Sequence, residues 1–525
     1  MRITNNMITS NTKSNINSNK LLINKYNTQM TTQKKISKAS ENPVIAIRSL
    51  RLSTTLTHLT QYVDNNIPDA EAWLDVTETA INNMKDLLAD IRTHCVNGST
   101  DTLKAEDRQT IVDALKSLSE QLYVEGNADY AGKTVFTGYR TSSNLTFNND
   151  EADTEYQITQ KFQSSELEEK RYYSGVVNVP ETLTDSVPEC DVVVREKTYE
   201  RLRLAYNGKT ELKNVSYTLK DGTEQNLVET DQNGNTTYNG ITVYESEEAW
   251  DAGTTAENWT AGEGADTTSA SGGKVVGDDE IVYIKKTGEF IFGKNIANTI
   301  SDGRASISAE YTKKDFSKGE LRPEYYYDCI DISDDNPEQH ITYTKQNQEI
   351  NYTIANNTEL TINTQASDVF DSGILRDVED LINVAQKSIA ANNKVVELEN
   401  MMNEAQYQNE EAQAKLQTYL DAAIREADFA DDDLQKTFEH YITAFDNYLE
   451  NVNVAITNVG SMQNRLQMTK TRVENQQMTI EDLKTANEDR DISDIIIDYT
   501  AAYNAYQASL TAASKVGDVS LLKYL

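Results

Sequence analysis

The sequence predicts an α+β protein in which both chain ends form one long antiparallel helical bundle or coiled coil, with a β-rich outer domain inserted between them. Near each end, apolar residues recur at alternating steps of three and four, which is typical of helices packed lengthwise on other helices. Between these segments the pattern changes to short alternating runs separated by turn dipeptides. Because neither helical seam can be buried by its own helix, we expect the chain to fold back and bring its ends together.

The first arm begins weakly and then becomes strongly helical. Residues 1–40 have scattered apolar side chains among many Asn and Thr, which predicts a weak helix that orders with partners. Residues 40–43 then offer a helix start, because a capping side chain precedes a proline, which the first turn tolerates. The helical pattern of residues 44–96 has one fault: at Ile67 a second consecutive step of four occurs beside Pro68. We expect a bend or a break there, since proline lacks a backbone N–H.

A second helix is expected to run back along the first. Asn97-Gly98 is a helix-ending signal, and the apolar stripe that follows has helical spacing. That stripe consists of Ile111, Leu115, Leu118 and Leu122. The short connection predicts an antiparallel hairpin.

The middle of the chain reads as strands and turns. The strand-like runs are Val192–Val194, Val215–Leu219, Ile281–Ile284, Phe290–Phe292, Ile350–Ile354 and Leu360–Ile362. Asn-Gly or Asp-Gly pairs, which favour hairpin turns, begin at Asn207, Asp221, Asn233, Asn239 and Asp302. Residues 251–274 are rich in Gly, Ala, Ser and Thr and predict a loop.

The last arm is helical from Gly373 almost to the end. Residues 395–423 form one apolar seam, which breaks around Asp431–Asp433, and a further seam starts at Phe438. Near Val459, two successive steps of three predict local overwinding. The bundle seam is therefore assigned to Leu74, Ile81 and Leu88 of the first arm and to Phe445, Leu449, Val452 and Ile456 of the last arm.

These patterns divide the chain into three parts. Terminal helical segments occupy 1–40 and 486–525, the bundle occupies 41–140 and 374–485, and the β-rich insertion occupies 141–373.

Composition excludes several classes of partner. The chain has 49 Lys and Arg against 84 Asp and Glu, a net charge of −35, and so it lacks the basic surface that nucleic acids require. No run approaches the ~20 apolar residues of a membrane span, so we expect no membrane insertion. Cys95, Cys190 and Cys329 lie far apart and predict ordinary thiols. The N-terminal segment lacks the apolar core of a cleaved secretory signal, so the protein either stays inside the cell or leaves by another route.

No catalytic, cofactor or metal site is predicted, and we expect no enzyme. Gly132-Lys133-Thr134 follows a helix and lacks the first glycine of a phosphate-binding loop. The segment 231–242 begins like a calcium loop but has threonines where that loop needs glycine and glutamate. An acidic cluster at 328–335 fits a solvated loop better than a cation site. The four histidines belong to no recognisable nucleophile motif.

Several separated motifs nevertheless resemble the flagellin family. At the N-terminal end these are MRITNNMI, KISKASENPVIAIRSLRL (35–52), QYVDNNIPDAEAWLDVTETAINNM (61–84) and YAGKTVFTG (130–138). At the C-terminal end they are VGSMQNRLQMTKTRVENQ (459–476), DISDIIIDYTAAYNAYQASLTAAS (491–514) and the closing SLLKYL. The stretch SENPV at 40–44 replaces the double-aspartate stretch typical of filament flagellins, and favours the subunits that join hook to filament.

The resemblance implies a secreted structural subunit of the bacterial flagellum, exported through the flagellar type III channel and located between hook and filament. It implies a homo-oligomeric ring, contacts with neighbouring hook-associated and flagellin subunits, and an export chaperone on the C-terminal helix before secretion. The implied C-terminal interface is Ile492, Ile496, Tyr499, Tyr503, Tyr506, Leu510, Ala513, Leu521, Leu522 and Leu525. The implied N-terminal interface is Ile3, Met7, Ile16, Leu22, Tyr26 and Met30.

Three alternatives stay open at this point. The chain could be a filament flagellin, which would lie along the whole filament. It could be an extracellular adhesin or enzyme with its activity in residues 141–373. It could also be an intracellular coiled-coil scaffold, which would function without export.

Overall fold

The computed structural model describes residues 5–100, 103–183, 188–230, 236–256, 259, 267–334 and 336–518. The chain forms two compact units. The first contains Met1–Glu71, Asn351–Leu360 and Met462–Leu525, and the second contains Ala72–Ile350 and Thr361–Ser461. The three-part division inferred from the sequence stays a prediction.

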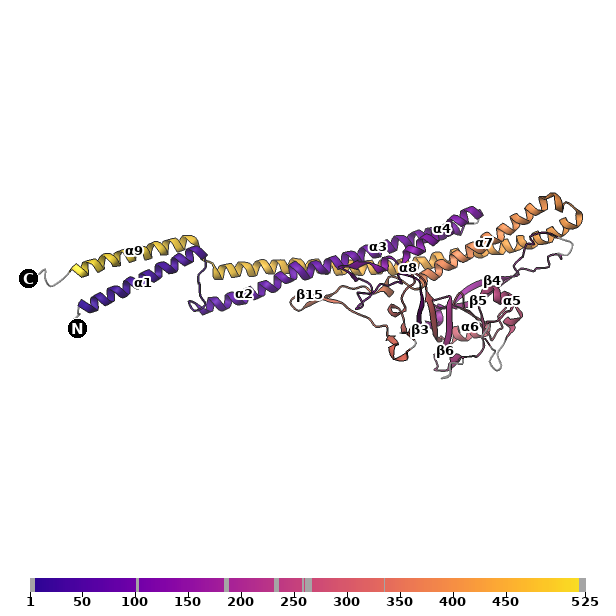
Figure 1. The fold of residues 1–525 in the computed structure, drawn as a ribbon, viewed down its shortest axis with the longest axis horizontal. Helices are drawn as coiled ribbons and strands as arrows, with labels where there is room; N and C mark the ends of the chain where they lie inside the picture. Colours follow the sequence, from indigo (N-terminus) through magenta and orange to yellow (C-terminus); the bar gives the residue numbers. More distant parts are fainter. Residues whose placement is uncertain are drawn as a thin grey trace, which may run out of the picture. The chain divides into compact units, whose positions relative to one another are not determined.

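The first unit is built from helices that come from both ends of the chain. Helix α1 (Asn5–Thr32) lies beside α9 (Ile492–Asp518), as Figure 1 shows in indigo and yellow. Helix α2 (Pro43–Gln61) begins where the sequence predicts, with the Asn42 side chain accepting the N–H groups of Val44 and Ile45. This cap satisfies donors that the first helical turn leaves free.

The predicted fault beside Pro68 takes the form of a π-helical turn. The π segment η1 (Tyr62–Asn66) joins α2 to α3 (Ile67–Gly98), and the Ile67 N–H donates to the Tyr62 carbonyl. In a regular α-helix the carbonyl of Asp64 would accept from residue 68, but proline has no N–H to donate. One wider turn absorbs this mismatch, so the chain stays helical instead of breaking.

A β-hairpin packs against this π turn. Strands β15 (Asn351–Ala355) and β16 (Thr358–Thr361) form the hairpin. The Asn66 side chain donates to the Thr353 carbonyl at 2.7 Å, and Ala355 packs with Leu59 and Val473. The irregular stretch of helix is therefore covered by a second element of the same unit.

The second unit contains a helical bundle. Helix α4 (Ala105–Leu122) runs back along α3. A hydrogen bond of 3.0 Å from Asn83 in α3 to Glu125, just beyond the end of α4, shows this arrangement. Helix α7 (Gly373–Asn403) packs on α4, and the turn η8 (Ala405–Tyr407) leads from α7 into α8 (Glu410–Glu488). The hairpin predicted after Asn97-Gly98 is thus present.

The single seam predicted for residues 395–423 does not lie on one helix, since the chain turns between α7 and α8. The seam break predicted at Asp431–Asp433 leaves the helix intact, because α8 continues unbroken through Asp431–Asp433 and Val459. The carboxylates do not disturb the helix because they are bound from outside it: Asp431 accepts from Arg108 at 3.1 Å, and Asp432 accepts from Arg171 at 2.6 Å. Both arginines are distant in sequence.

The β-rich part contains two main sheets (Figure 1). The five-stranded sheet has the order β4-β5-β11-β10-β9, and the seven-stranded sheet has the order β14-β13-β3-β12-β6-β7-β8. Their strands are β3 (Glu151–Gln163), β4 (Glu168–Ser174), β5 (Arg195–Arg203), β6 (Lys209–Thr218), β7 (Glu224–Thr230), β8 (Thr236–Tyr238), β9 (Ile241–Tyr244), β10 (Ile281–Ile284), β11 (Glu289–Phe292), β12 (Ser306–Phe316), β13 (Asp328–Asp331) and β14 (Ile341–Tyr343). The remaining elements of this unit are β1 (Asp129–Tyr130), β2 (Lys133–Thr134), α5 (Glu247–Ala252), α6 (Lys294–Asp302) and the short turns η2 (Glu125–Asn127), η3 (Ser164–Glu166), η4 (Thr268–Ser271), η5 (Pro323–Tyr325), η6 (Pro337–Gln339) and η7 (Ala366–Asp368).

Most predicted strands are present, but Val192–Val194 is not one of them. These valines precede β5, and Val192 packs with Leu416 in the hydrophobic cluster beside the α7–α8 turn. Val215–Leu219, Ile281–Ile284 and Phe290–Phe292 correspond to β6, β10 and β11. Val192 and Val194 of this apolar triplet thus pack beside helices, and periodicity alone does not distinguish such a run from a strand.

The turn dipeptides predicted to form hairpins have several roles. Asp221-Gly222 connects the paired strands β6 and β7. Asn207 and Asn239 instead lie where the chain crosses from one sheet to the other, and Asp302 ends α6. Asn233 lies outside the described residues.

Two glycine substitutions test this packing. A Cβ at Gly293, just before α6, would lie 2.0 Å from the Gly277 carbonyl oxygen, so Gly293→Ala should lower the free energy of unfolding by about 1–3 kcal/mol through overpacking. Gly460→Ala is the control, because a Cβ there meets nothing within 4 Å and should add roughly 0.5–1 kcal/mol of helix propensity. Urea unfolding followed by tryptophan fluorescence measures both. Equal stabilities for the two variants would contradict the packing described.

Candidate assembly surfaces and their support

The terminal helices α1 and α9 pair in antiparallel fashion along a narrow seam. On α9 the buried residues are Ile495, which is fully buried, and Ala502. On α1, Asn19 donates to Ser509 at 3.0 Å, while Ile23 and Tyr26 are half-buried. Few large side chains form this seam, and each helix contributes only one of its faces to it.

A second apolar stripe on α9 is exposed. Ile492, Ile496, Tyr503 and Leu510 are between 43% and 49% exposed, and Ile497 is 65% exposed. Of the other predicted C-terminal interface residues, Tyr499, Tyr506 and Ala513 are half-buried, whereas Leu521, Leu522 and Leu525 lie outside the described residues. The sequence analysis missed Ile495 and Ala502, because the run Ile495-Ile496-Ile497 supplies apolar residues to more than one helix face.

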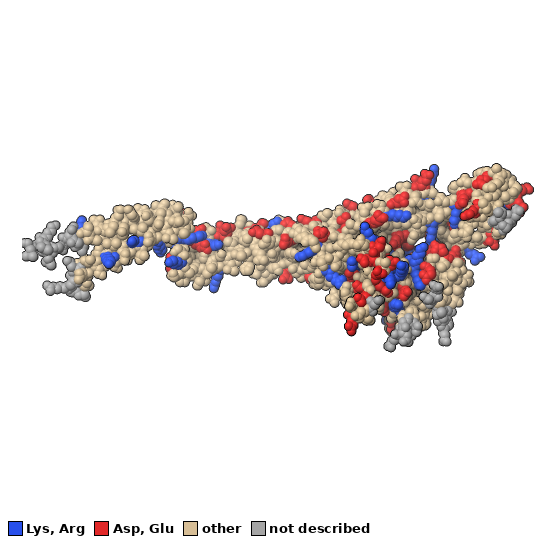
Figure 2. Space-filling model, in the orientation of Figure 1, with Lys and Arg blue, Asp and Glu red and all other residues tan. Residues whose placement is uncertain are grey.

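The predicted N-terminal interface is divided in the same way. Met7 is 53% exposed and Leu22 is 40% exposed, whereas Ile16, Tyr26 and Met30 are half-buried. Ile3 lies outside the described residues. Figure 2 shows that the visible face of the terminal pair carries few charged side chains.

A polar joint connects this pair to α2 and α8. The Lys35 N–H donates to the Glu488 carbonyl at 2.6 Å, and the Arg490 N–H donates to the Gln33 carbonyl at 2.9 Å. Gln29, only 5% exposed, accepts from the Arg490 guanidinium at 2.9 Å and donates to the Lys35 carbonyl at 2.6 Å. The two connecting segments are therefore hydrogen-bonded to each other, a feature that sequence reasoning missed because the partners are more than 450 residues apart.

The bundle seam of the second unit is well buried. Leu74, Ile81, Leu88, Phe445 and Val452 are fully buried. Leu449 and Ile456 are half-buried. The interhelical ion pair between Arg92 and Asp446 flanks the seam, with Nη2 3.2 Å from Oδ2.

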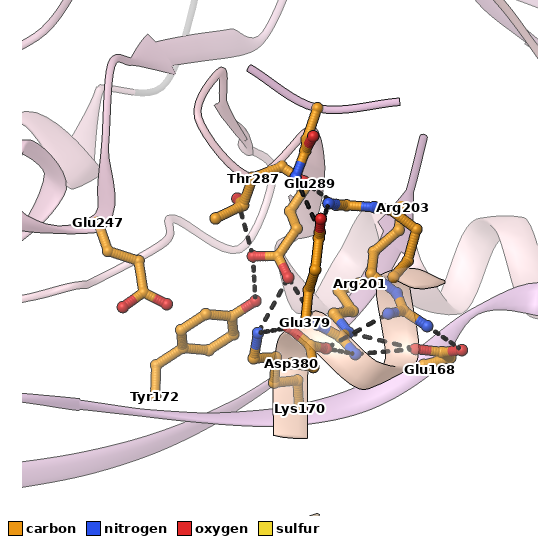
Figure 3. A network of polar contacts seen from close by, with 12 residues as sticks. Glu168, Lys170, Tyr172, Arg201, Arg203, Glu247, Thr287, Glu289, Glu379 and Asp380 are labelled. Atoms are coloured by element: carbon orange, nitrogen blue, oxygen red, sulfur yellow. Dashed lines mark hydrogen bonds and ion pairs between the residues drawn. The ribbon is translucent and has the colours of Figure 1, made fainter. Parts of the chain in front are cut away.

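A buried charged network attaches the five-stranded sheet to this bundle (Figure 3). Arg201 of β5 bonds Glu289 of β11 at 2.6 Å and Asp380 of α7 at 2.7 Å. Arg203 bonds Asp377 of α7 at 2.5 Å, and Lys170 of β4 bonds Glu289 at 2.9 Å. Sheet and helix are therefore joined by charges, and removal of one partner leaves a buried charge uncompensated.

Hydroxyl groups from α8 complete the network. The Tyr441 hydroxyl donates to Asp380 at 2.8 Å, and the Tyr448 hydroxyl donates to Asp377 at 2.9 Å. These bonds bring α8 into the same polar cluster as α7 and the sheet. No sequence pattern predicts this network, because each member is an ordinary charged or aromatic residue in its own segment.

The network lowers the pKa values of two of its carboxyl groups, whereas the pKa of a third is raised. Burial raises the pKa values of Asp380 and Glu289, but Arg201 and Lys170 outweigh burial and hold both pKa values below their ordinary range. For Asp377, burial outweighs Arg203, so its pKa is raised. Asp380 and Glu289 therefore favour folding when ionised, and Asp377 opposes them in part.

A cleft of about 990 Å³ borders the start of β5, the helix α5 and the helices α7 and α8. Its buried Glu247 binds Lys274 at 3.4 Å and also Lys387, and its Glu426 binds Lys394 at 2.8 Å. Among the described residues, no group of three or more His, Cys, Asp or Glu side chains is arranged to hold a metal ion. In the same residues, every helix is too short or too polar to cross a membrane.

Acid should weaken the charged network. Because Asp380 and Glu289 have lowered pKa values in the folded state, their contribution is present above their ordinary pKa values of about 4 and is lost as pH falls below them. Asp380→Asn should lower the free energy of unfolding at neutral pH by about 3–5 kcal/mol and flatten its decrease below about pH 5. Denaturant titrations at each pH measure this.

The matched control is Asp432→Asn, which removes an ion pair whose carboxylate is 43% exposed and should cost about 0–1 kcal/mol. The same pH dependence in the unaltered chain and in Asp380→Asn would contradict the role of the network.

Comparison with known proteins finds similarity to one family at both chain ends. Residues 3–141 match the bacterial flagellin N-terminal helical region, and residues 442–525 match the bacterial flagellin C-terminal helical region. The family resemblance predicted from the sequence is therefore confirmed in both terminal regions.

The individual proteins that match this chain have low sequence identity to it. Flagellar hook-associated protein 3 of Escherichia coli (strain K12) is 28% identical over 126 residues, which are 23% of this chain and 38% of that protein. The match thus spans well under half of that relative. A solved flagellar junction protein from Legionella pneumophila is 10% identical, with a TM-score of 0.28, over 85% of this chain and 100% of its own. A Vibrio parahaemolyticus structure titled as a flagellar hook-associated protein is 12% identical, with a TM-score of 0.36, over 86% and 100%.

Proposed function

The chain carries both helical regions of the flagellin family, one at each end, and on this basis we propose that it is a structural subunit of the bacterial flagellum that joins hook to filament. The observation that carries the proposal is the paired terminal helices, which match the family and keep a second apolar stripe exposed. The name of the curated relative, a hook-associated protein, and the stretch at 40–44 favour the junction over the filament.

The mechanism is axial packing of helices. In each subunit one face of α9 is occupied by α1, and the stripe Ile492, Ile496, Tyr503 and Leu510 faces outward. Burial of such side chains against a neighbouring subunit stabilises association by about 25 cal/mol for each Å² of apolar surface removed from water. An inner contact within the subunit and an outer contact between subunits therefore coexist on one helix.

In this proposal each of the three predicted parts of the chain has its own role. The segments 1–40 and 486–525 make the axial contacts, 41–140 and 374–485 form the bundle, and 141–373 faces outward. The partners are other copies in a ring, neighbouring hook-associated and flagellin subunits, and an export chaperone that covers the C-terminal helix before secretion. The proposed route of export is the flagellar type III channel, and the proposed role is structural.

Localisation tests the proposal. Immunogold labelling of intact flagella should give one band between hook and filament. Label along the whole filament would indicate filament flagellin instead. Recovery of the chain only from the cytosol, after the flagella are sheared off, would contradict a flagellar role altogether.

The exposed stripe can be tested by a single charge. Ile496→Glu should reduce the amount of the chain in sheared flagella about tenfold or more, since a buried unpaired carboxylate is costly at an interface. Ala508→Glu adds the same charge at an exposed position outside the stripe and should leave incorporation within about twofold of the unaltered chain. Quantitative immunoblotting of flagella measures both, and equal losses would argue against the stripe.

A further inference from the structure

Helix α2 and the C-terminal part of α8 pack side by side in the first unit. The Asn487 side chain donates to the Ile45 carbonyl at 3.1 Å, and the Gln477 side chain donates to Thr60 at 3.0 Å. As the α2 number rises the α8 number falls, so the two helices run antiparallel. Each helix therefore has an inner face toward its partner and flanks that face away.

One flank of α2 is apolar and basic. Val44 is 75% exposed, Ile47 is 54% exposed, and Arg48 and Arg51 are exposed. Their steps of three, one and three place them on one side of a helix with 3.6 residues per turn. Within the described residues neither guanidinium has an ion-pair partner. We name these four residues the α2 stripe.

One flank of α8 is apolar and acidic. Met478 is 59% exposed, Glu481 and Asp482 are exposed, and Glu474 is half-buried. Their steps of four, three and one again select one side of the helix. Among the residues that the structure describes, these carboxylates also make no ion pair. We name these residues the α8 stripe.

The two stripes do not meet within one subunit. Each residue turns the helix by about 100°, so Val44 and Ile47 lie more than a quarter turn from Ile45 on the inner face of α2. Met478 and Asp482 likewise lie more than a quarter turn from Gln477 on α8, and Arg48 and Glu481 lie at the inner edges of their stripes. Because the helices are antiparallel and the stripes turn away in opposite senses, one stripe faces each broad side of the helix pair. A contact between them needs two copies of the chain.

We propose that the α2 stripe of one copy docks on the α8 stripe of the next copy, as a head-to-tail contact within the junction. Val44 and Ile47 meet Met478, while Arg48 and Arg51 pair with Glu481 and Asp482. This inference rests on the proposed function and names the residues that select the neighbouring copy. Such a heterologous contact closes into a ring when its rotation closes.

The charge of the chain favours this occupant. At a net charge of −35, copies repel one another, so contact between them needs cations that are not already neutralised within the subunit. Arg48 and Arg51 are such cations, and the same chain supplies the matching carboxylates. A second copy is thus the partner whose complementary surface is present in this structure.

Charge reversal tests the pairing. R48E with R51E should reduce the chain recovered in sheared flagella about tenfold, because it places like charges opposite each other. E481K with D482K should do the same. All four substitutions together restore opposite charges and should restore incorporation to within about twofold. Co-expression of the two defective double variants should also restore it, because each stripe then finds its complement on the other copy.

The control for net charge is K161E with K197E, on exposed strand positions, which should leave incorporation unchanged. Circular dichroism melting verifies that each variant folds. Normal incorporation of both double variants, or failure of the fourfold variant to recover, would overturn the pairing and assign the stripes to another protein or to none. Absence of the unaltered chain from flagella would instead overturn the proposed function.

Discussion

Neither end of this chain can bury its apolar face without the other end. None of the described apolar residues of helix α1 is fully buried even when it is paired, and the paired helix α9 buries Ile495 and Ala502. The same dependence applies along the bundle, where Ile81 and Phe445 are fully buried although their helices are far apart in sequence. Isolated amphipathic helices gain most of their stability from such packing and little from propensity. The return of the chain is therefore the constraint on which everything else depends.

Polar contacts align the segments that come together when the chain folds back. At the joint, Gln29 and Arg490 connect the two segments, and the backbone bonds around Lys35 align them. In the second unit, Arg201 and Arg203 bond carboxylates on α7 and on the sheet. Buried ion pairs add little net stability, because desolvation offsets much of their attraction, but they penalise misaligned arrangements. Apolar seams thus supply the stability, and charges supply the alignment.

The sequence predicted the elements whose signal is local. Helical periodicity indicated both arms, the start of α2 followed from Asn42-Pro43, and Pro68 marked the irregular turn. Predictions failed where a distant residue decides the outcome. The strand-like run at 192–194 packs beside helices that are distant from it in sequence. The charged network was not predictable from the sequence, since no sequence pattern links Arg201 to Asp380.

The assembly residues were predictable only in part. Ile495, Ile496 and Ile497 point in different directions from one helix, and the sequence does not say which of them faces α1. Tertiary packing decides this: it buries Ile495 and leaves Ile496 exposed. The intermolecular role of the exposed face is the part that we propose.

Cross-linking of the terminal helices within one subunit tests the return of the chain most directly. Asn19 and Ser509 are hydrogen-bonded at 3.0 Å, so cysteines at both positions, in a chain with Cys190→Ser, should form a disulfide on mild oxidation. The expected product is a monomer with an internal bond, formed at a rate independent of protein concentration. Oxidation that yields only dimers linked between chains, or no bond at either site, would contradict the pairing of the two ends.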